Sequence, residues 1–409
     1  MNYSDENFER FSADLACQVG ASDLLWLTRD ALFNSITYRS SSEQKVPLRN
    51  RFGVLGYGLC WLLRERRERA SVAPLAEVAE ASLGFLFLEV RDAHFMTLYP
   101  IFKEGGSDGV AWLADDAIRE RLTEASAVQS VAGQWVHFVR LRDFWTVGRM
   151  ILKAYHSLGG AFGREARGRF AEYLIQYFSW KRFWRQSLGK KLEAVYTTSE
   201  SAPVAKALFA VAQECGISRI HWCHGFRHAT WQVTLASELV CNTKGDARYF
   251  ESRVPAGCNV VHQPNPRVLA IAEAVGPARV LNHDDVPNIL FMSQGPESPY
   301  TPEMRLKDLR LLKRLVTERN ALLRVRPHPR ENLGLLKEAL DRAGVKNYSL
   351  SSEDLAEDLR WSDVVCTSWS TALLEAYACG RECIWVNANV DQFPVVQELI
   401  GDGVGYLFD

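Results

Sequence analysis

Residues 363–380 read DVVCTSWSTALLEAYACG, a stretch that combines an apolar run, a turn rich in hydroxyl groups and a helical pattern. The run Asp363–Cys366 is typical of a buried parallel strand. Ala372–Cys379 has the pattern of a helix, and Gly380 closes it. A strand that leads through Thr367–Thr371 directly into a helix predicts one βα unit of a parallel α/β sheet.

A second stretch, Arg326-Pro-His-Pro329, follows the apolar run Ala321–Val325 in the same way. Each proline fixes its own φ and restricts the residue before it, so His328 is held rigidly. In a doubly wound sheet, ligands bind at the carboxyl ends of the strands, and a helix start with hydroxyl groups favours an anion. The sequence therefore predicts that the C-terminal half binds a nucleotide or a sugar phosphate.

Strands and helices alternate along the chain from about residue 81, which indicates parallel βαβ units. The other expected strands are 84–90, 109–113, 135–139, 192–196, 217–223, 287–292, 348–350 and 382–386, the last ending the second sheet. The other expected helices are 93–103, 144–188, 202–215, 302–319, 333–343 and 353–360.

This alternation predicts an α/β fold with two Rossmann-like domains facing a central cleft. Two domains are expected because a chain of 409 residues is longer than one hydrophobic core usually accommodates. The expected boundaries are 1–80 for a mostly helical N-terminal extension, 81–275 for the first domain, 285–409 for the second, and a linker near 265–286. No GxGxxG fingerprint is present, so we expect no nicotinamide or flavin cofactor.

The composition narrows the class of protein further. A net charge of −1 argues against a protein that coats nucleic acid. Nine cysteines without a CxxC pair indicate reduced thiols. The start Met1–Glu6 lacks the basic, apolar pattern of a signal peptide, and no apolar run reaches the roughly 18–20 residues that span a bilayer. We therefore expect a cytoplasmic protein.

Two basic stretches that also carry aromatic residues, 49–69 and 180–191, suit the inner face of the cytoplasmic membrane. Basic and aromatic side chains together favour an anionic membrane surface. The alternative is an ordinary amphipathic helix with a solvated basic face, and this is the commoner case.

Several residues of the second half suit the phosphate of a nucleotide. Each lies at a predicted strand end, where a backbone N–H, an imidazole or a guanidinium can reach a phosphate. These candidates are Ser293, Gln294, Gly295, Arg326, His328 and Pro329.

The hydroxyl cluster Ser368, Ser370 and Thr371 offers more groups than the single hydroxyl that N-capping needs. We therefore expect these side chains to contact the same phosphate. Glu375 lies one turn into the following helix, where it reaches a ribose or sugar hydroxyl. Alternatively, Glu375 is merely a favourable acid near a helix start.

If the bound donor passes its group to an acceptor hydroxyl, a base in the first half must take the proton. Position at a strand end favours Glu200, Asp143 and His224, while Glu104 and Asp108 are further candidates, and the sequence does not rank them.

The histidine and cysteine residues around this strand predict no metal site. His221 falls inside the predicted strand, and we expect it in the core. Neighbouring strand residues such as His221, Cys223 and His224 point to alternate faces, and no second ligand pair has metal spacing, so no structural zinc is expected.

Three motifs together resemble bacterial GT-B transferases that build capsules and lipopolysaccharide: His224-Gly225, Arg326–Pro329 and Ser368–Thr371. The His-Pro motif followed by a serine/threonine pair is similar to that of enzymes that use CMP-sugars, namely sialyltransferases, polysialyltransferases and Kdo transferases. The resemblance implies that His328 and the pair Ser370/Thr371 bind the CMP phosphate. It also implies an N-terminal acid as base and an inverting, metal-independent displacement.

The implied partners are a CMP-activated acidic sugar and an oligosaccharide or glycolipid acceptor, with no cofactor and no nucleic acid. The same motifs are similar to those of teichoic-acid polymerases that use CDP-glycerol, where the His-Gly histidine would be the base. A transferase using a UDP- or GDP-sugar, and a scaffold without enzymatic activity, remain further alternatives.

Overall fold

The computed structural model describes residues 81–408, apart from 89–91, 106–107, 115, 123–127, 132–139, 141–142, 144, 151–163, 226–234, 281, 283–284, 295–299 and 329–330. Its contacts divide the chain into two compact units. The first comprises Met1–His221 with Thr234–Ser237, and the second comprises Trp222–Val233 with Glu238–Asp409. The expected extension 1–80, the basic stretch 49–69 and the expected strand 135–139 lie outside the described residues.

A seven-stranded sheet runs in the order β3-β2-β1-β4-β5-β6-β7. Its strands are β1 (Leu83–Phe87), β2 (Gly109–Leu113), β3 (Val128–Ser130), β4 (Ala194–Thr197), β5 (Ser218–Trp222), β6 (Glu238–Cys241) and β7 (Asn259–His262). Strands β1 and β2 are parallel and almost wholly buried, which explains their continuous apolar sequences. The order reverses between β1 and β4, so residues after β4 lie at a topological switch point.

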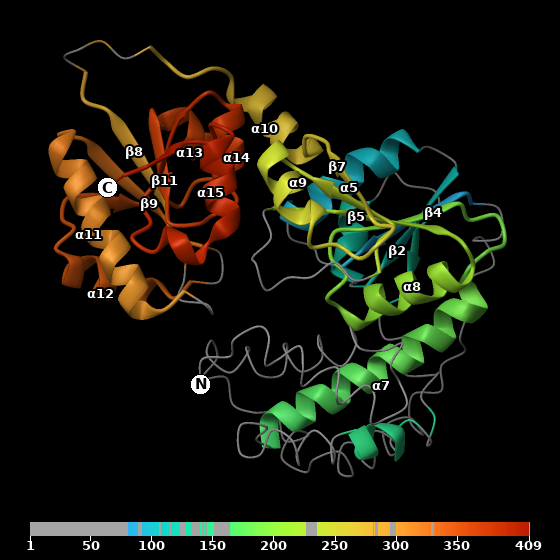
Figure 1. Ribbon diagram of the computed structural model, residues 1–409. Helices are drawn as coiled ribbons and strands as arrows, with labels where there is room; N and C mark the ends of the chain where they lie inside the picture. Colours follow the sequence, from blue (N-terminus) through green and yellow to red (C-terminus); the bar gives the residue numbers. More distant parts are fainter. Residues whose placement is uncertain are drawn as a thin grey trace. The chain divides into compact units, whose positions relative to one another are not determined.

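The helices in this part of the chain are α5 (Asp92–Glu104), α7 (Arg164–Ser187), α8 (Pro203–Glu214), α9 (Lys244–Glu251), α10 (Pro266–Val275) and the 3-10 helix η5 (Asp116–Arg121). Helix α7 packs along α8 (Figure 1), and the Trp184 indole donates to the Val204 carbonyl at 3.0 Å. Trp180, Phe183 and Trp184 are buried. The aromatic side chains of stretch 180–191 therefore belong to the core, as the amphipathic-helix alternative predicts.

A six-stranded sheet follows in the order β10-β9-β8-β11-β12-β13. Its strands are β8 (Asn288–Met292), β9 (Leu322–Arg326), β10 (Tyr348–Leu350), β11 (Val364–Thr367), β12 (Glu382–Trp385) and β13 (Tyr406–Leu407). Its helices are α11 (Pro302–Glu318), α12 (Leu333–Ala343), α13 (Leu355–Trp361), α14 (Leu373–Ala378), α15 (Pro394–Gly401) and the 3-10 helix η8 (Val390–Gln392). If the six strands are numbered from one along the chain, their order is 3-2-1-4-5-6, which is the Rossmann arrangement. The switch point lies between β8 and β11.

Local sequence signals set the helix ends in this domain. Thr301 accepts a hydrogen bond from the Met304 amide at the start of α11, and Pro302 occupies the first turn. Gly344 ends α12 in the left-handed region, at φ 73°, where a residue without Cβ carries little strain. Apolar residues of α11 and α12, including Leu312 and Leu336, are then buried against the sheet.

The two sheets confirm the expected α/β fold with two Rossmann-like domains, the composition of the GT-B class. The expectation that residues 382–386 end the second sheet is wrong, because β13 pairs with β12 beyond it. Strand β13 has only two residues, too few to show a period.

The expected linker at 265–286 contains helix α10, which packs on α13 and α14. The sequence reading also missed β6, α9 and β7, which precede it. Strands β6 and β7 and helix α9 belong to the second compact unit. No helix among the described residues has the length and apolar character that a membrane crossing requires.

Candidate functional site

The switch point of the second sheet gathers two of the predicted motifs. Strands β8 and β11 pair in parallel with Met292 opposite Thr367, so Ser293 and Ser368 follow adjacent strand ends. The Thr367 hydroxyl donates to the Met292 carbonyl at 2.8 Å. It also accepts from the Ser370 amide at 3.0 Å, which fixes the turn between the strand and α14.

Ser368 is the most buried member of the hydroxyl cluster, whereas Ser370 and Thr371 are half-buried. The Ser368 hydroxyl lies 3.0 Å from the Tyr300 hydroxyl, which donates to Asp308 Oδ2 at 2.7 Å. Asp308 Oδ1 accepts the Ala388 amide at 2.8 Å. This chain orients Ser368, while Ser370 and Thr371 remain at the partly exposed start of α14.

Burial sets the protonation of this chain. Desolvation, followed by the neighbouring Asp308 carboxylate, raises the pKa of Tyr300 well above its ordinary value. Burial also raises the pKa of Asp308, against the hydrogen bonds from Tyr300 and Ala388 that lower it. The phenol therefore keeps its proton and donates.

A buried ion pair, Arg305 with Glu331, connects the ends of β8 and β9. Arg305 Nη2 contacts Glu331 Oε1, and both side chains are at most 5% exposed. The same Nη2 lies 3.2 Å from the Ser293 hydroxyl, and Glu331 Oε2 accepts the His328 amide at 3.2 Å. We call this pair the Arg305–Glu331 clamp, because it holds Ser293 and His328 to one another.

Arg326 has two hydrogen-bond partners within the protein. Its Nη1 donates to the buried Asp358 at 2.6 Å and to the Glu353 carbonyl at 2.7 Å. Arg324 donates to the same carboxylate at 3.1 Å. The Arg326 guanidinium therefore ties β9 to α13 in this structure, and its contact with a phosphate stays a prediction. Pro329 and Gly295 lie outside the described residues.

Glu375 is a buried carboxylate, 2% exposed, at the start of α14. Its Oε1 lies 2.5 Å from Arg267 Nη2 of α10. Its Oε2 is buried and has no hydrogen-bond partner among the described residues. The side-chain oxygen of Gln294, which follows β8, is likewise buried without a hydrogen-bond partner among the described residues. Buried polar atoms normally find a donor, so both oxygens suit hydroxyl or amino groups of a ligand.

His224 and Gly225 lie beside the hydroxyl cluster within the second unit. A Cβ placed on Gly225 would stand 2.4 Å from Thr371 Cγ2, which means that the loop approaches Thr371 as closely as a glycine allows. His224 is half-buried. The structure thus joins the His-Gly motif to the Ser368–Thr371 motif, which the sequence separates by more than a hundred residues.

Glu200 lies at the switch point of the first sheet, in a buried polar network. It is 1% exposed, accepts the Leu235 amide at 3.0 Å and lies 3.2 Å from His221 Nδ1. The His221 Nε2 faces the Thr198 carbonyl at 3.2 Å, so this histidine is a core residue, as predicted. Lys206 Nζ lies 4.0 Å from Glu200.

Asp143, the third candidate base, is buried and paired with Arg182, whose Nη1 donates to Oδ1 at 3.1 Å. Its Oδ2 accepts the Arg140 amide at 2.8 Å. Glu104 and Asp108 are exposed. Catalytic roles for these acids stay predictions.

The sequence reading missed Tyr300, Arg267 and both members of the Arg305–Glu331 clamp. Their sequence neighbourhoods are those of ordinary helix and loop residues, and their partners are distant along the chain. The one signal available was Pro266 after Asn265, a start for the helix that carries Arg267.

No protein-family model and no curated protein matches the sequence. Among solved structures, the chain is similar to a UDP-GlcNAc 2-epimerase from Methanocaldococcus jannaschii, with 12% identity and a TM-score of 0.46, covering 80% of this chain and 88% of that one. It is also similar to MurG from Acinetobacter baumannii, with 14% identity and a TM-score of 0.42, covering 80% of this chain and 85% of that one. At this identity and TM-score, likeness identifies neither a reaction nor a ligand.

Proposed function

We propose that this chain is a GT-B glycosyltransferase that binds a nucleotide sugar at the switch point of its second sheet. The observation that carries the proposal is Glu375 Oε2, a buried acceptor without a described partner beside a cluster of hydroxyl groups. A ribose presents a pair of hydroxyl donors, and a carboxylate is the acceptor that binds them best. Arg267 holds the other oxygen.

The phosphate of the nucleotide is assigned to the hydroxyl cluster and His328. Ser370 and Thr371 are half-buried and offer hydroxyl donors, and the Arg305–Glu331 clamp fixes the main chain of His328. An imidazole and hydroxyl donors can share the charge that develops on a leaving phosphate. This supports transfer that needs no metal ion to bind the leaving group.

The donor that we favour is a CMP-activated acidic sugar, and the acceptor a bacterial surface glycan. In the proposed step the acceptor oxygen bonds to the anomeric carbon while the bond from that carbon to the CMP phosphate oxygen breaks. The electron pair leaves with CMP, the acceptor proton passes to a base, and the anomeric configuration inverts. The support for this donor is the similarity of the His-Pro and serine/threonine motifs.

We assign the base to His224. It precedes Gly225, whose backbone closely approaches Thr371, and histidine is the side chain that most often serves as a general base near neutral pH. Glu200 and Asp143 already take part in buried networks with His221 and Arg182. The test is the pH dependence of turnover in His224→Gln. If turnover in the variant no longer falls at acidic pH, the assignment is supported. An unchanged pH dependence with full activity would contradict it.

Thermal-shift titrations without added metal test the donor. We would compare CMP, CDP, UMP, UDP, GDP and ADP, because a ligand specific for the folded state raises the melting temperature. CMP should stabilise the protein, and His328→Ala should abolish the shift, whereas Glu338→Gln on the exposed side of α12 should leave it unchanged.

Other outcomes would replace this donor. A preference for CDP would indicate polyol-phosphate transfer, and one for UDP or GDP would indicate another sugar donor. No shift with any nucleotide would contradict the proposal and favour a scaffold.

A further inference from the structure

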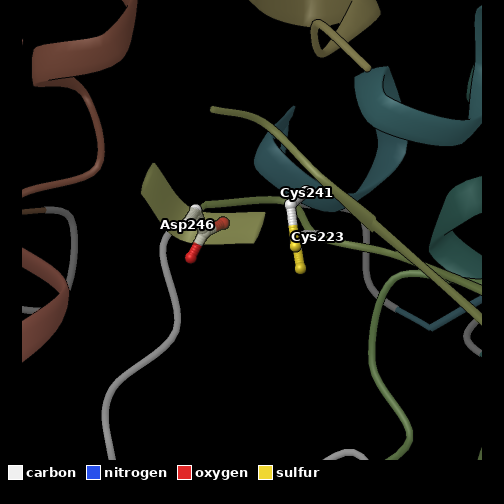
Figure 2. Close-up of side chains that lie close together, drawn as sticks. All are labelled: Cys223, Cys241 and Asp246. Carbon is white, nitrogen blue, oxygen red and sulfur yellow. The ribbon is translucent and has the colours of Figure 1, made fainter. Parts of the chain in front are cut away.

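Three side chains that the proposed reaction does not use lie together in the second unit: Cys223, Cys241 and Asp246 (Figure 2). Their sulfur and carboxylate atoms all lie within 4.8 Å of one another. All three residues are at most 1% exposed. Figure 2 shows the two sulfur atoms next to each other, with the Asp246 carboxylate to one side.

The fold explains how residues that are distant in sequence meet here. Cys223 follows β5, and its amide donates to the Val240 carbonyl of the neighbouring β6 at 2.9 Å. Cys241 is the last residue of β6. Asp246 lies in the first turn of α9, where its amide donates to the Thr243 hydroxyl at 3.0 Å. Two adjacent strand ends and a capped helix start therefore hold the three ligand atoms.

The chemistry of this set matches a thiophilic divalent cation. Thiolates and a carboxylate are established zinc ligands, and zinc takes four ligands in a tetrahedron. Hard cations such as Ca²⁺ or Mg²⁺ prefer oxygen alone, so two sulfur atoms argue against them. Two thiolates and a carboxylate would carry three negative charges in a buried place, and a divalent cation would offset most of this charge.

We propose that Cys223, Cys241 and Asp246 form a zinc site, with a water molecule or a further group of the chain as the fourth ligand. Ligand atoms on one zinc ion lie about 3.5–4 Å apart. The observed atoms, within 4.8 Å of one another, therefore need to close by about 1 Å or less, which side-chain rotation can supply.

The position of the site gives it a consequence for the chain. Cys223 immediately precedes His224-Gly225, so a metal at Cys223 would hold the start of that loop. Cys241 and Asp246 would fix the same point to β6 and α9. We assign the zinc a structural role, because all three ligands are fully buried. This assignment does not depend on which nucleotide the donor carries.

The test begins with the full-length wild-type chain, purified under reducing conditions with zinc supplied and excess metal removed. Elemental analysis should find about one zinc per chain. Replacement by Co²⁺ should give a near-ultraviolet thiolate-to-cobalt charge-transfer band. Each of Cys223→Ser, Cys241→Ser and Asp246→Asn should lower zinc affinity by more than about tenfold. Cys258→Ser, which alters a half-buried cysteine of the same unit, should leave it unchanged.

Three results would overturn the proposal. One is wild-type protein that takes up neither zinc nor cobalt. Another is cobalt binding that Cys258→Ser weakens as much as Cys223→Ser does. The third is a Cys223–Cys241 disulfide, seen as the loss of two hydrogens by mass in protein that was kept reduced. The wild-type measurement decides the matter even if a variant fails to fold.

Discussion

Glu375 shows how a single residue can indicate a ligand. A fully buried carboxylate is costly to keep ionised, and Arg267 offsets that cost at one oxygen only. The second oxygen, Oε2, has no hydrogen-bond donor among the described residues. The sequence predicted this residue as a ribose contact, but it offered the helix-start alternative equally. The structure adds what the sequence lacks, namely the burial of the carboxylate and the identity of its cationic partner.

Gly225 provides a test at the residue scale. A Cβ there would lie 2.4 Å from Thr371 Cγ2 and 2.9 Å from Thr371 Cβ, so Gly225→Ala should lower the free energy of unfolding by about 1–3 kcal/mol in urea denaturation. Adding Thr371→Ser removes the nearest atom and should restore part of the loss.

The matched control is Gly401→Ala, since nothing lies within 4 Å of a Cβ at that position. If Gly225→Ala were as stable as Gly401→Ala, the close approach of the His224-Gly225 loop to Thr371 would be wrong.

At the scale of elements, the Arg305–Glu331 clamp joins the ends of β8 and β9. Arg305→Met should cost about 3–5 kcal/mol of unfolding free energy, because it leaves a buried carboxylate uncompensated. The double variant Arg305→Met/Glu331→Met should cost less than the single one. Equilibrium denaturation measures both, and the exposed Glu318→Gln serves as a control with an effect below about 0.5 kcal/mol.

Additive losses in the double variant would contradict the clamp. A second readout separates positioning from plain stability. If the clamp holds His328 in place, Glu331→Gln should raise the KM for the donor more than it lowers kcat, under conditions where the variant is folded.

The helix α11 and the loop before it supply a pH-dependent contribution through Asp308. Its folded pKa is raised by burial, so the folded state binds the proton more tightly than the unfolded chain does. The stability contributed by Asp308 is therefore full below the ordinary carboxyl pKa of about 4, and it is lost as the pH rises through the raised value.

The measurement is the unfolding free energy of the wild type minus that of Asp308→Asn, at a series of pH values from about 4 upward. The difference should fall as the pH rises, because other carboxyl groups contribute equally to both proteins. A difference that stays level or grows would contradict the raised pKa.

Elements with strong local signals were predictable, and short ones were not. Strands β8, β9 and β11 are apolar runs, and each precedes a distinctive polar motif, so the sequence placed them within a residue or two. Strands β6 and β7 have four residues each, and helix α9 has eight, too few for a clear period. The contacts that hold the site together join residues far apart in sequence, such as Tyr300 with Ser368, and no local pattern encodes them.

At the scale of the whole molecule, the two sheets share the same order over six strands, and the first sheet adds β7 at its edge. Each sheet therefore has one switch point at which a ligand can lie across the strand ends. In the second sheet this point carries the hydroxyl cluster and Ser293. In the first sheet it carries the buried network of Glu200 and His221. Polar residues thus lie at the switch point of each sheet, half-buried in part in the second sheet and buried in the first.

The most direct test of the account is a comparison of CMP with 2′,3′-dideoxy-CMP, measured by titration calorimetry on the wild type and on Glu375→Gln. If Glu375 Oε2 accepts the ribose hydroxyls, losing those hydroxyls should weaken wild-type binding by about tenfold or more, and should weaken binding to the variant much less. Equal losses in both proteins, or wild-type binding that ignores the ribose hydroxyls, would contradict the nucleotide site.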